Sequence, residues 1–243
     1  MKTMIKSICL VAVMLVANVA FAQSTEEILA KHEAAMGGAD KWATVKTAVV
    51  KNKFNVQGMD IESKTSLVVG KSFRQEVEVM GNKIITEIDG HKGWMNRPAM
   101  MGGTGEPEDM QSEQVKMSSS QKYLGSILTN AKKDGYKIEL VAKEKLDGAD
   151  VYLLTVTKPS GEDSKVYVST ATNYVVKTQA KVQVNGQEVE TEASYSNYKM
   201  VNGLAFPFTV ETANPMGGMM TVETVSVEIN PSIDPVIFAK SSK

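Results

Sequence analysis

From about Val45 onward, apolar side chains recur at every second residue in short segments, and this period constrains the fold more than any other feature. The segments are rich in Val, Ile and Thr. Glycines 9 to 12 residues apart separate the early segments, namely Gly58, Gly70, Gly81 and Gly90. A period of two with turn residues at this spacing is typical of an antiparallel meander. In the first segment, the residues expected on one face are Ala48, Val50, Phe54 and Val56.

Roughly eleven or twelve strands are expected in the whole chain. After the first, the early segments are Ile61–Val69, Phe73–Met80, Lys83–Asp89 and Lys92–Asn96. The later segments are Tyr136–Lys143, Val151–Lys158, Lys165–Ser169, Tyr174–Val184, Glu188–Lys199, Leu204–Thr212 and Met219–Ile229. Asn185-Gly186 is the strongest hairpin signal in the chain.

Helices are expected near the N-terminus and in the middle of the chain. Ser24–Glu27 fits a capping box, and the helix that it begins ends at Gly37-Gly38. Asp40 is expected to cap a second short helix. In the middle, Pro107 is expected to open a helix at its first position. Ser118–Ser120 then restarts a helix whose apolar side chains are Tyr123, Leu124, Ile127, Leu128 and Ala131.

A single sheet of this size must curl, split or close to hide its apolar face. The two helical regions are amphipathic and can cover the concave side of a curled sheet. The sequence therefore predicts a mainly β (α+β) fold, in which a large curled antiparallel sheet forms an unclosed half-barrel with helices over its concave face. No composition shift marks a second domain, so residues 23–243 are expected to form one. The tail Pro231–Lys243 is expected to run along the sheet edge.

The first 22 residues are expected to be a cleaved secretory signal. Lys2 and Lys6 precede an apolar run from Ile8 to Val19, and Ala20-Phe21-Ala22 places the cleavage site before Gln23. The run is too short for a membrane-spanning helix, which needs about 20 apolar residues. The lone cysteine, Cys9, lies inside the run, so no cysteine follows it to carry a lipid.

The composition of the mature chain excludes several classes of function. Without cysteine it has no disulfides, thiol catalysis or thiolate metal sites. Loss of two lysines and no acid with the signal takes the formal net charge from -1 to -3. A chain without a basic surplus is disfavoured as a nucleic-acid binder.

The sequence gives no positive support for catalysis, and we expect no enzyme, no metal site and no cofactor. The mature chain has two histidines, His32 and His91, and it lacks the spacing H-E-x-x-H. It also lacks G-x-S-x-G, a phosphate loop and a dinucleotide fingerprint. His91 beside Asp89 is better interpreted as a turn histidine than as a proton-transfer pair. The acidic groups at 106–109 and 162–163 are expected to be solvated or helix-capping carboxylates.

Methionines cluster at two places in the mature chain, around the Gly-rich loops Pro98–Gly105 and Asn214–Gly218. Methionine suits surfaces that adapt to variable apolar shapes, although single methionines usually fill a core. Trp94 is either a buried anchor of the sheet or a wall of the pocket. The residues expected to line an apolar cavity or its lid are Phe54, Arg74, Trp94, Met95, Met100, Met101, Met110, Met117, Leu124, Leu128, Phe206, Phe208 and Met219.

The order of several short motifs along the chain resembles the LolA-like family of periplasmic outer-membrane lipoprotein carriers. In the first half the motifs are Met36-Gly37-Gly38, Phe73-Arg74-Gln75-Glu76 and the run from Asp89 to Met95. In the second half they are the run from Tyr195 to Phe208, Val227-Glu-Ile-Asn230-Pro231 and Asp234-Pro235-Val-Ile-Phe238. The second set resembles the branch of the family common in Bacteroidetes-type bacteria.

The resemblance implies an unclosed antiparallel barrel with helices over its opening and an apolar cavity between them. It implies a monomeric, non-enzymatic periplasmic carrier that shields lipoprotein acyl chains or another lipid and exchanges them with membrane-bound donor and acceptor proteins. It also implies that Arg74 helps to hold the helical lid closed; the alternative for Arg74 is an ion pair with Glu76 or Glu78. Two other functions stay open, a lipid-responsive envelope sensor or adaptor and a hydrolase acting on lipid or glycan.

Overall fold

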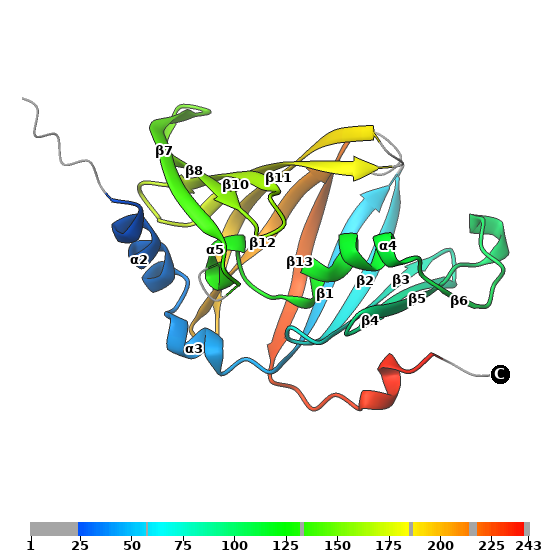
Figure 1. Ribbon diagram of the computed structural model, residues 1–243. Coiled ribbons are helices and arrows are strands. Elements are labelled where there is room, and N and C mark those ends of the chain that lie inside the picture. Colours follow the sequence, from blue (N-terminus) through cyan, green and yellow to red (C-terminus); the bar gives the residue numbers. More distant parts are fainter. Residues whose placement is uncertain (1–23, 57, 132–133, 185–186, 214–217, 241–243) are drawn as a thin grey trace, which may run out of the picture.

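One continuous antiparallel sheet of thirteen strands accounts for most of the described chain, and short helices lie on its faces (Figure 1). The computed structural model describes residues 24–56, 58–131, 134–184, 187–213 and 218–240. The predicted signal, the Asn185-Gly186 turn and most of the methionine-containing loop Asn214–Gly218 lie outside these ranges. The sheet is not closed into a barrel, which confirms the predicted mainly β, unclosed half-barrel.

The strands follow one another with tight turns between most of them. In the first half they are β1 Thr47–Val56, β2 Met59–Val68, β3 Ser72–Val79, β4 Asn82–Asp89, β5 Lys92–Asn96 and β6 Pro107–Asp109. In the second half they are β7 Lys137–Leu146, β8 Ala149–Thr157, β9 Asp163–Ser169, β10 Val175–Val184, β11 Gln187–Val201, β12 Leu204–Ala213 and β13 Met219–Ile229. The helical segments are α2 Thr25–Ala35, α3 Ala39–Ala43, η1 Ala99–Met101, α4 Ser112–Ser118, η2 Ser119–Lys122, α5 Ile127–Asn130 and η3 Pro235–Phe238.

The strand order is β6-β5-β4-β3-β2-β1-β13-β12-β11-β10-β9-β8-β7, so β6 and β7 are two separate edges. Strands β1 and β13 join the two halves in the middle of the sheet, with Ala48 opposite Ile229. Between Lys51 and Asn52 their register shifts at a bulge. A bulge bends a strand and increases its twist, which helps a large sheet to curl.

The central segment differs from the sequence-based expectation at its start. Pro107 does not open a helix, because residues 107–109 pair with Trp94–Asn96 as the edge strand β6. Strand β6 is the one strand of the thirteen that the sequence did not predict. Pro107 fits in it because a residue on an edge strand can face solvent without donating an N–H to a neighbouring strand. Helix α4 begins only at Ser112, after the backbone N–H of Gln111 donates to Gln114 Oε1 at 2.9 Å.

The expectation of one helix across 118–131 is also wrong. The 3-10 turn η2 ends at Lys122, and Tyr123 is extended with φ −105° and ψ 151°. A new short helix, α5, begins after Ser126. At the N-terminal side, Gly38 and not Asp40 occupies the N-cap of α3.

The two halves of the sheet bury the same face beneath different helices, and we call this face the inner face. In the first half, Val115 of α4 packs on Ala48, Leu67, Phe73 and Ile88, which lie side by side on neighbouring strands. In the second half, Ile28 of α2 and Leu128 of α5 pack on a cluster from β8, β9 and the start of β10, which comprises Leu154, Val156, Val166, Val168 and Val175. Leu124, between the helices, contacts the first cluster and a third one around Phe206.

The C-terminal segment lies against the opposite, outer face of β3 and β4, on the side away from α4 (Figure 1). The prediction that the tail runs along the sheet edge is therefore wrong for the described residues up to 240. The Thr47 hydroxyl donates to Pro231 O at 2.8 Å where the segment leaves β13. Phe238 of η3 is buried, so its burial pulls the segment onto the sheet.

Two of the sequence motifs pack against each other where α2 meets the β11–β12 turn. The N–H of Ala205 donates to Met36 O at 3.1 Å, and the indole N–H of Trp42 donates to the same oxygen at 3.0 Å. Gly37 follows with φ +107°, and a Cβ there would overlap Gly203 O. Both conditions exclude other side chains at position 37.

Replacement of Gly37 by alanine is expected to lower the free energy of unfolding by about 2 kcal/mol or more, because strain and overlap act together. Gly38→Ala is the matched control, since Gly38 also has a positive φ of +90° but no atom lies within 4 Å of its would-be Cβ. Urea unfolding followed by circular dichroism gives both values. Equal losses for the two variants would contradict the close packing at Gly37.

Candidate functional site: the inner face of the sheet

The inner face is apolar, and the helices cover only part of it. Several apolar side chains on this face, by strand register, are neither buried nor fully exposed. Of these, we call the following eight the inner strip: Val50, Phe54, Val77, Ile84, Met95, Phe208, Val210 and Val222. Phe54 lies opposite Val222, which lies opposite Val210 on the next strand. The strip is therefore continuous across the junction of the two halves, where an apolar ligand could lie.

A segment from Met110 to Leu128, here called the lid, covers the inner face on either side of the strip. Position 93 on β5 must be small both for the sheet and for the lid, because a Cβ on Gly93 would lie 2.8 Å from Glu87 O, 3.0 Å from Met110 Sδ and 3.2 Å from Val115 Cγ2. Lys122 anchors the middle of the lid to two turns. Its ammonium donates to Gly90 O at 2.9 Å, and its carbonyl accepts from the N–H of Gly70 at 2.9 Å.

A buried histidine fixes the C-terminal end of the lid to the N-terminal helix. His32 of α2 is 2% exposed; its Nδ1 lies 2.7 Å from Asn173 O and its Nε2 lies 2.7 Å from Ser126 Oγ. Burial lowers the pKa of His32, so the ring is neutral at pH 7. Since a carbonyl only accepts, Nδ1 donates to Asn173, and Nε2 accepts from the Ser126 hydroxyl.

A small pocket of about 50 Å³ lies beside this histidine, between α2, α3 and α5. Its lining residues are Leu29, His32, Glu33, Met36, Ala39, Trp42, Leu128 and Thr129. Pockets that hold drug-sized ligands are roughly 300–1,000 Å³, so this one is too small for a long acyl chain.

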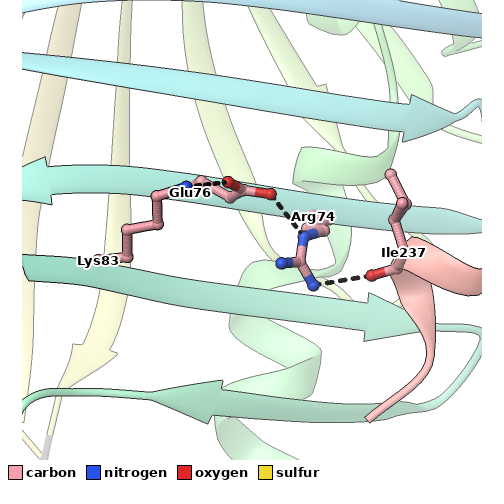
Figure 2. A network of polar contacts seen from close by, with 4 residues as sticks. All are labelled: Arg74, Glu76, Lys83 and Ile237. Atoms are coloured by element: carbon pink, nitrogen blue, oxygen red, sulfur yellow. Dashed lines mark hydrogen bonds and ion pairs between the residues drawn. The ribbon is translucent and has the colours of Figure 1, made fainter. Parts of the chain in front are cut away.

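Arg74 lies on the outer face and does not contact the lid. Its Nε donates to Glu76 Oε1 at 2.9 Å, and its Nη1 donates to Ile237 O at 2.7 Å in the C-terminal segment (Figure 2). The expectation that Arg74 holds the helical lid is thus not met, because Phe73 and not Arg74 points toward α4. The ion pair with Glu76, the alternative drawn from the sequence, is present, and Lys83 joins it at 3.7 Å.

Trp94 is a buried anchor of the outer face. It is 5% exposed, and the Arg74 guanidinium carbon lies 5.6 Å from its ring centroid. Glu87 stands between them, opposite Arg74 on one side and opposite Trp94 on the other. Glu87 Oε1 and Trp94 Nε1 are both buried without a hydrogen-bond partner. Burial, reinforced by the charge of Asp89, raises the pKa of Glu87 to about 7 despite Arg74.

The remaining predicted residues lie in several parts of the structure. Phe54, Met95 and Phe208 belong to the inner strip, and Met110, Leu124, Leu128 and Phe206 lie under or in the cover. Met101 lies in η1 between β5 and β6, and Met100 there is 66% exposed. Met219 is 54% exposed at the start of β13, opposite Ala213 on the outer face. Met117 lies in α4, and its side chain is not described.

Sequence reasoning missed part of the strip and the histidine anchor. Val77, Ile84, Val210 and Val222 were not singled out, although their period of two marks them as one face of their strands. Val50 was expected on the same face as Phe54 but was not included among the cavity residues. The contacts of His32 with Ser126 and Asn173 join positions 94 and 141 residues apart, and no local pattern signals them.

The groups considered for catalysis are engaged elsewhere or exposed. His91 is exposed, and Asp89 accepts from the Ser72 hydroxyl at 2.7 Å. Of the acidic pairs, Asp109 contacts Lys240 and Glu162 contacts Lys158, both at 2.9 Å on the surface. Within the described ranges, His, Asp and Glu side chains form no group of three that could hold a metal ion. None of the helices described is long and apolar enough to span a membrane.

Comparison with known proteins shows the fold. By sequence, the chain matches no protein-family model and no curated protein. By structure, it is similar to a LolA superfamily protein from Nitrosomonas europaea, with 14% identity, a TM-score of 0.57, and coverage of 90% of this chain and 99% of that chain. A DUF1329 family protein from Desulfovibrio piger gives 14% identity, a TM-score of 0.57 and coverage of 87% and 97%.

A third similar structure is an outer membrane lipoprotein-sorting protein domain from Vibrio parahaemolyticus, with 14% identity, a TM-score of 0.53 and coverage of 88% and 95%. Together these likenesses show that the chain has a LolA-like fold. The Bacteroidetes-type branch stays a prediction.

Ser126→Ala is expected to lower the free energy of unfolding by about 1–3 kcal/mol, because it leaves the buried His32 Nε2 without its donor. Ser120→Ala, at an exposed position of η2, is the control and should change it by less than about 0.5 kcal/mol. Urea unfolding at pH 7 measures both. A Ser126→Ala value within the range of the control would show that the histidine contact does not hold the lid.

Glu87 is expected to make stability fall as the pH rises from about 5 to 8. With its pKa raised to about 7, the folded state holds a proton that the unfolded state has already lost, so this stabilisation is present at low pH and disappears above pH 7. This pH-dependent contribution of Glu87 to the free energy of unfolding is at most about 3 kcal/mol. Glu87→Gln, which stays neutral, should flatten the dependence over this window. Parallel pH curves for the two proteins, from thermal unfolding, would refute the raised pKa.

Proposed function

We propose that the protein is a non-enzymatic periplasmic carrier that shields the acyl chains of lipoproteins or of another lipid against the inner strip. The observation that carries the proposal is the incomplete cover of an apolar inner face. Soluble domains usually bury such a face fully, and a partly open apolar surface of this kind suits an apolar ligand. The LolA-like fold of similar structures supports it.

The physical gain comes from removing methylene groups from water, at about 0.8 kcal/mol each. An acyl chain along the strip would contact Phe54, Val222 and Val210 in turn, which are neighbours on three adjacent strands. Met95 and Phe208 lie on the same face and add polarisable and aromatic contacts. Such contacts are non-directional, so they suit chains of differing length and saturation.

The lid is the part of the molecule that would move for a ligand to enter or leave. Helix α4 is seven residues long and contacts the sheet mainly through Val115, and Met110 before the helix packs on the same cluster. Lys122 and Ser126 hold the rest of the lid with hydrogen bonds. We therefore expect α4 to swing about η2 while α5 stays attached to α2. A ligand with higher affinity for the open form shifts the population toward it.

Transfer between membranes requires a donor that loads the carrier and an acceptor that unloads it. We propose membrane-bound proteins for both roles and a monomer as the travelling form. An apolar surface that is only partly covered binds reversibly, and this permits release at the acceptor. Export by a signal cleaved before Gln23 would place the protein in the periplasm.

Substitution of Val222 by aspartate is expected to weaken binding of the uncharged fluorescent probe N-phenyl-1-naphthylamine at least tenfold. A carboxylate in the strip costs desolvation in addition to the lost apolar contact. Val225→Asp is the matched control, because Val225 lies on the same strand at the bulge and is 56% exposed. Fluorescence titration gives both affinities, with circular dichroism to verify folding.

Two outcomes would count against the carrier. Wild-type protein that binds no probe and yields no lipid on organic extraction would refute binding of apolar ligands altogether. An equal loss of probe affinity in the Val222 and Val225 variants would show that the ligand does not bind at the inner strip.

A further inference from the structure

The register of the sheet places one charged side chain on the otherwise uncharged inner face of its central strands. Lys199 of β11 lies directly opposite Phe206, and the next inner pair is Val201 opposite Leu204. Phe206, Leu204 and Val201 all belong to the apolar cluster on the inner face. Lys199 therefore points to the same side of the sheet as the inner strip.

Other inner-face positions of these strands are apolar or neutral. Following the pairings, Lys199 is the one charged side chain on the inner face among the described residues of β1–β5 and β9–β13. Charged residues return to this face only on the strands at the β7 edge, as Lys143, Lys145 and Asp150. Its polar but uncharged companions include Thr65, Gln75, Thr86, Thr178 and Thr224. Lysines on the outer face, by contrast, commonly pair with acids, as Lys177 does with Glu192 at 2.8 Å.

Lys199 lies beside the inner strip and forms no ion pair with a described residue. Its Nζ lies 4.4 Å from the ring centroid of Phe208, a member of the strip, and its side chain is exposed. None of the ion pairs among the described residues includes Lys199. An ammonium held against an aromatic ring at the side of an apolar surface is placed to meet an anionic group at the end of an apolar chain.

We propose that Lys199 binds the anionic head group of an amphiphile whose acyl chain occupies the inner strip. This inference rests on the proposed carrier function and narrows its cargo to chains that end in a carboxylate or a phosphate, such as a free fatty acid or an anionic lysolipid. The shared chemistry is one long apolar chain with one compact anion. An uncharged ester or amide head leaves the ammonium without a counter-ion.

The test measures displacement of N-phenyl-1-naphthylamine from the full mature chain by three competitors: palmitate, palmitoyl lysophosphatidic acid and the uncharged monopalmitin. Lys199→Met keeps the length of the side chain and removes its charge, and Lys199→Arg restores the charge. Lys165→Met, on the outer face of β9, is the matched control.

We expect Lys199→Met to weaken binding of at least one anionic competitor about 5- to 30-fold, as for loss of one charge-assisted contact, and to leave monopalmitin unchanged. Lys199→Arg and Lys165→Met should retain the wild-type preference for anionic competitors over monopalmitin. Added salt should reduce that preference in all three proteins, because it screens the charge of residue 199. Loss with palmitate alone identifies a carboxylate, and loss with the lysolipid alone identifies a phosphate.

Equal affinities in wild type and Lys199→Met for both anions, or an equal loss for the anions and monopalmitin, would overturn the head-group role while leaving the carrier intact. Failure of the wild type to bind the naphthylamine probe would overturn the carrier itself and this inference with it.

Discussion

The cover over the inner face is the feature on which the rest of the structure depends. A curled sheet of thirteen strands presents far more apolar surface than the few short helices can hide. Val115 and Leu128 bury two separate clusters, each full burial contributing roughly 1.5–3 kcal/mol. Between these clusters the inner strip is left partly open.

The two faces of the sheet are stabilised by different kinds of interaction. On the inner face, the clusters beneath the helices are apolar. On the outer face, Arg74, Glu87 and Trp94 stack side by side beneath the C-terminal segment. This cluster contains two buried polar atoms without a hydrogen-bond partner, an arrangement that lowers stability in the absence of compensation. The segment that carries Phe238 therefore shields the cluster of Arg74, Glu87 and Trp94 from water.

Much of the fold could be predicted from the sequence because its signals are local. Alternating side chains and the glycine turns define twelve of the thirteen strands, and the size of the sheet requires it to curl. What could not be predicted depends on contacts between distant residues. Pro107 forms an edge strand because Trp94–Asn96 offers a partner, and Arg74 faces outward because Phe73 beside it is needed inside. Of the methionines predicted for the site, Met95 and Met110 lie on or over the inner face, whereas Met100 and Met219 are exposed, and valines make up much of the strip.

The absence of closure between β6 and β7 has a mechanical consequence. In a closed barrel, the number of strands and their stagger fix the diameter. Among the described residues no ladder of hydrogen bonds joins the two edges, so the distance between the halves depends on the twist of the sheet and on the lid, which contacts both halves. Small torsional changes spread over many residues can widen or narrow the space between the halves without breaking a pair of strands. In this respect the open sheet is deformable, whereas the width of a closed barrel is fixed.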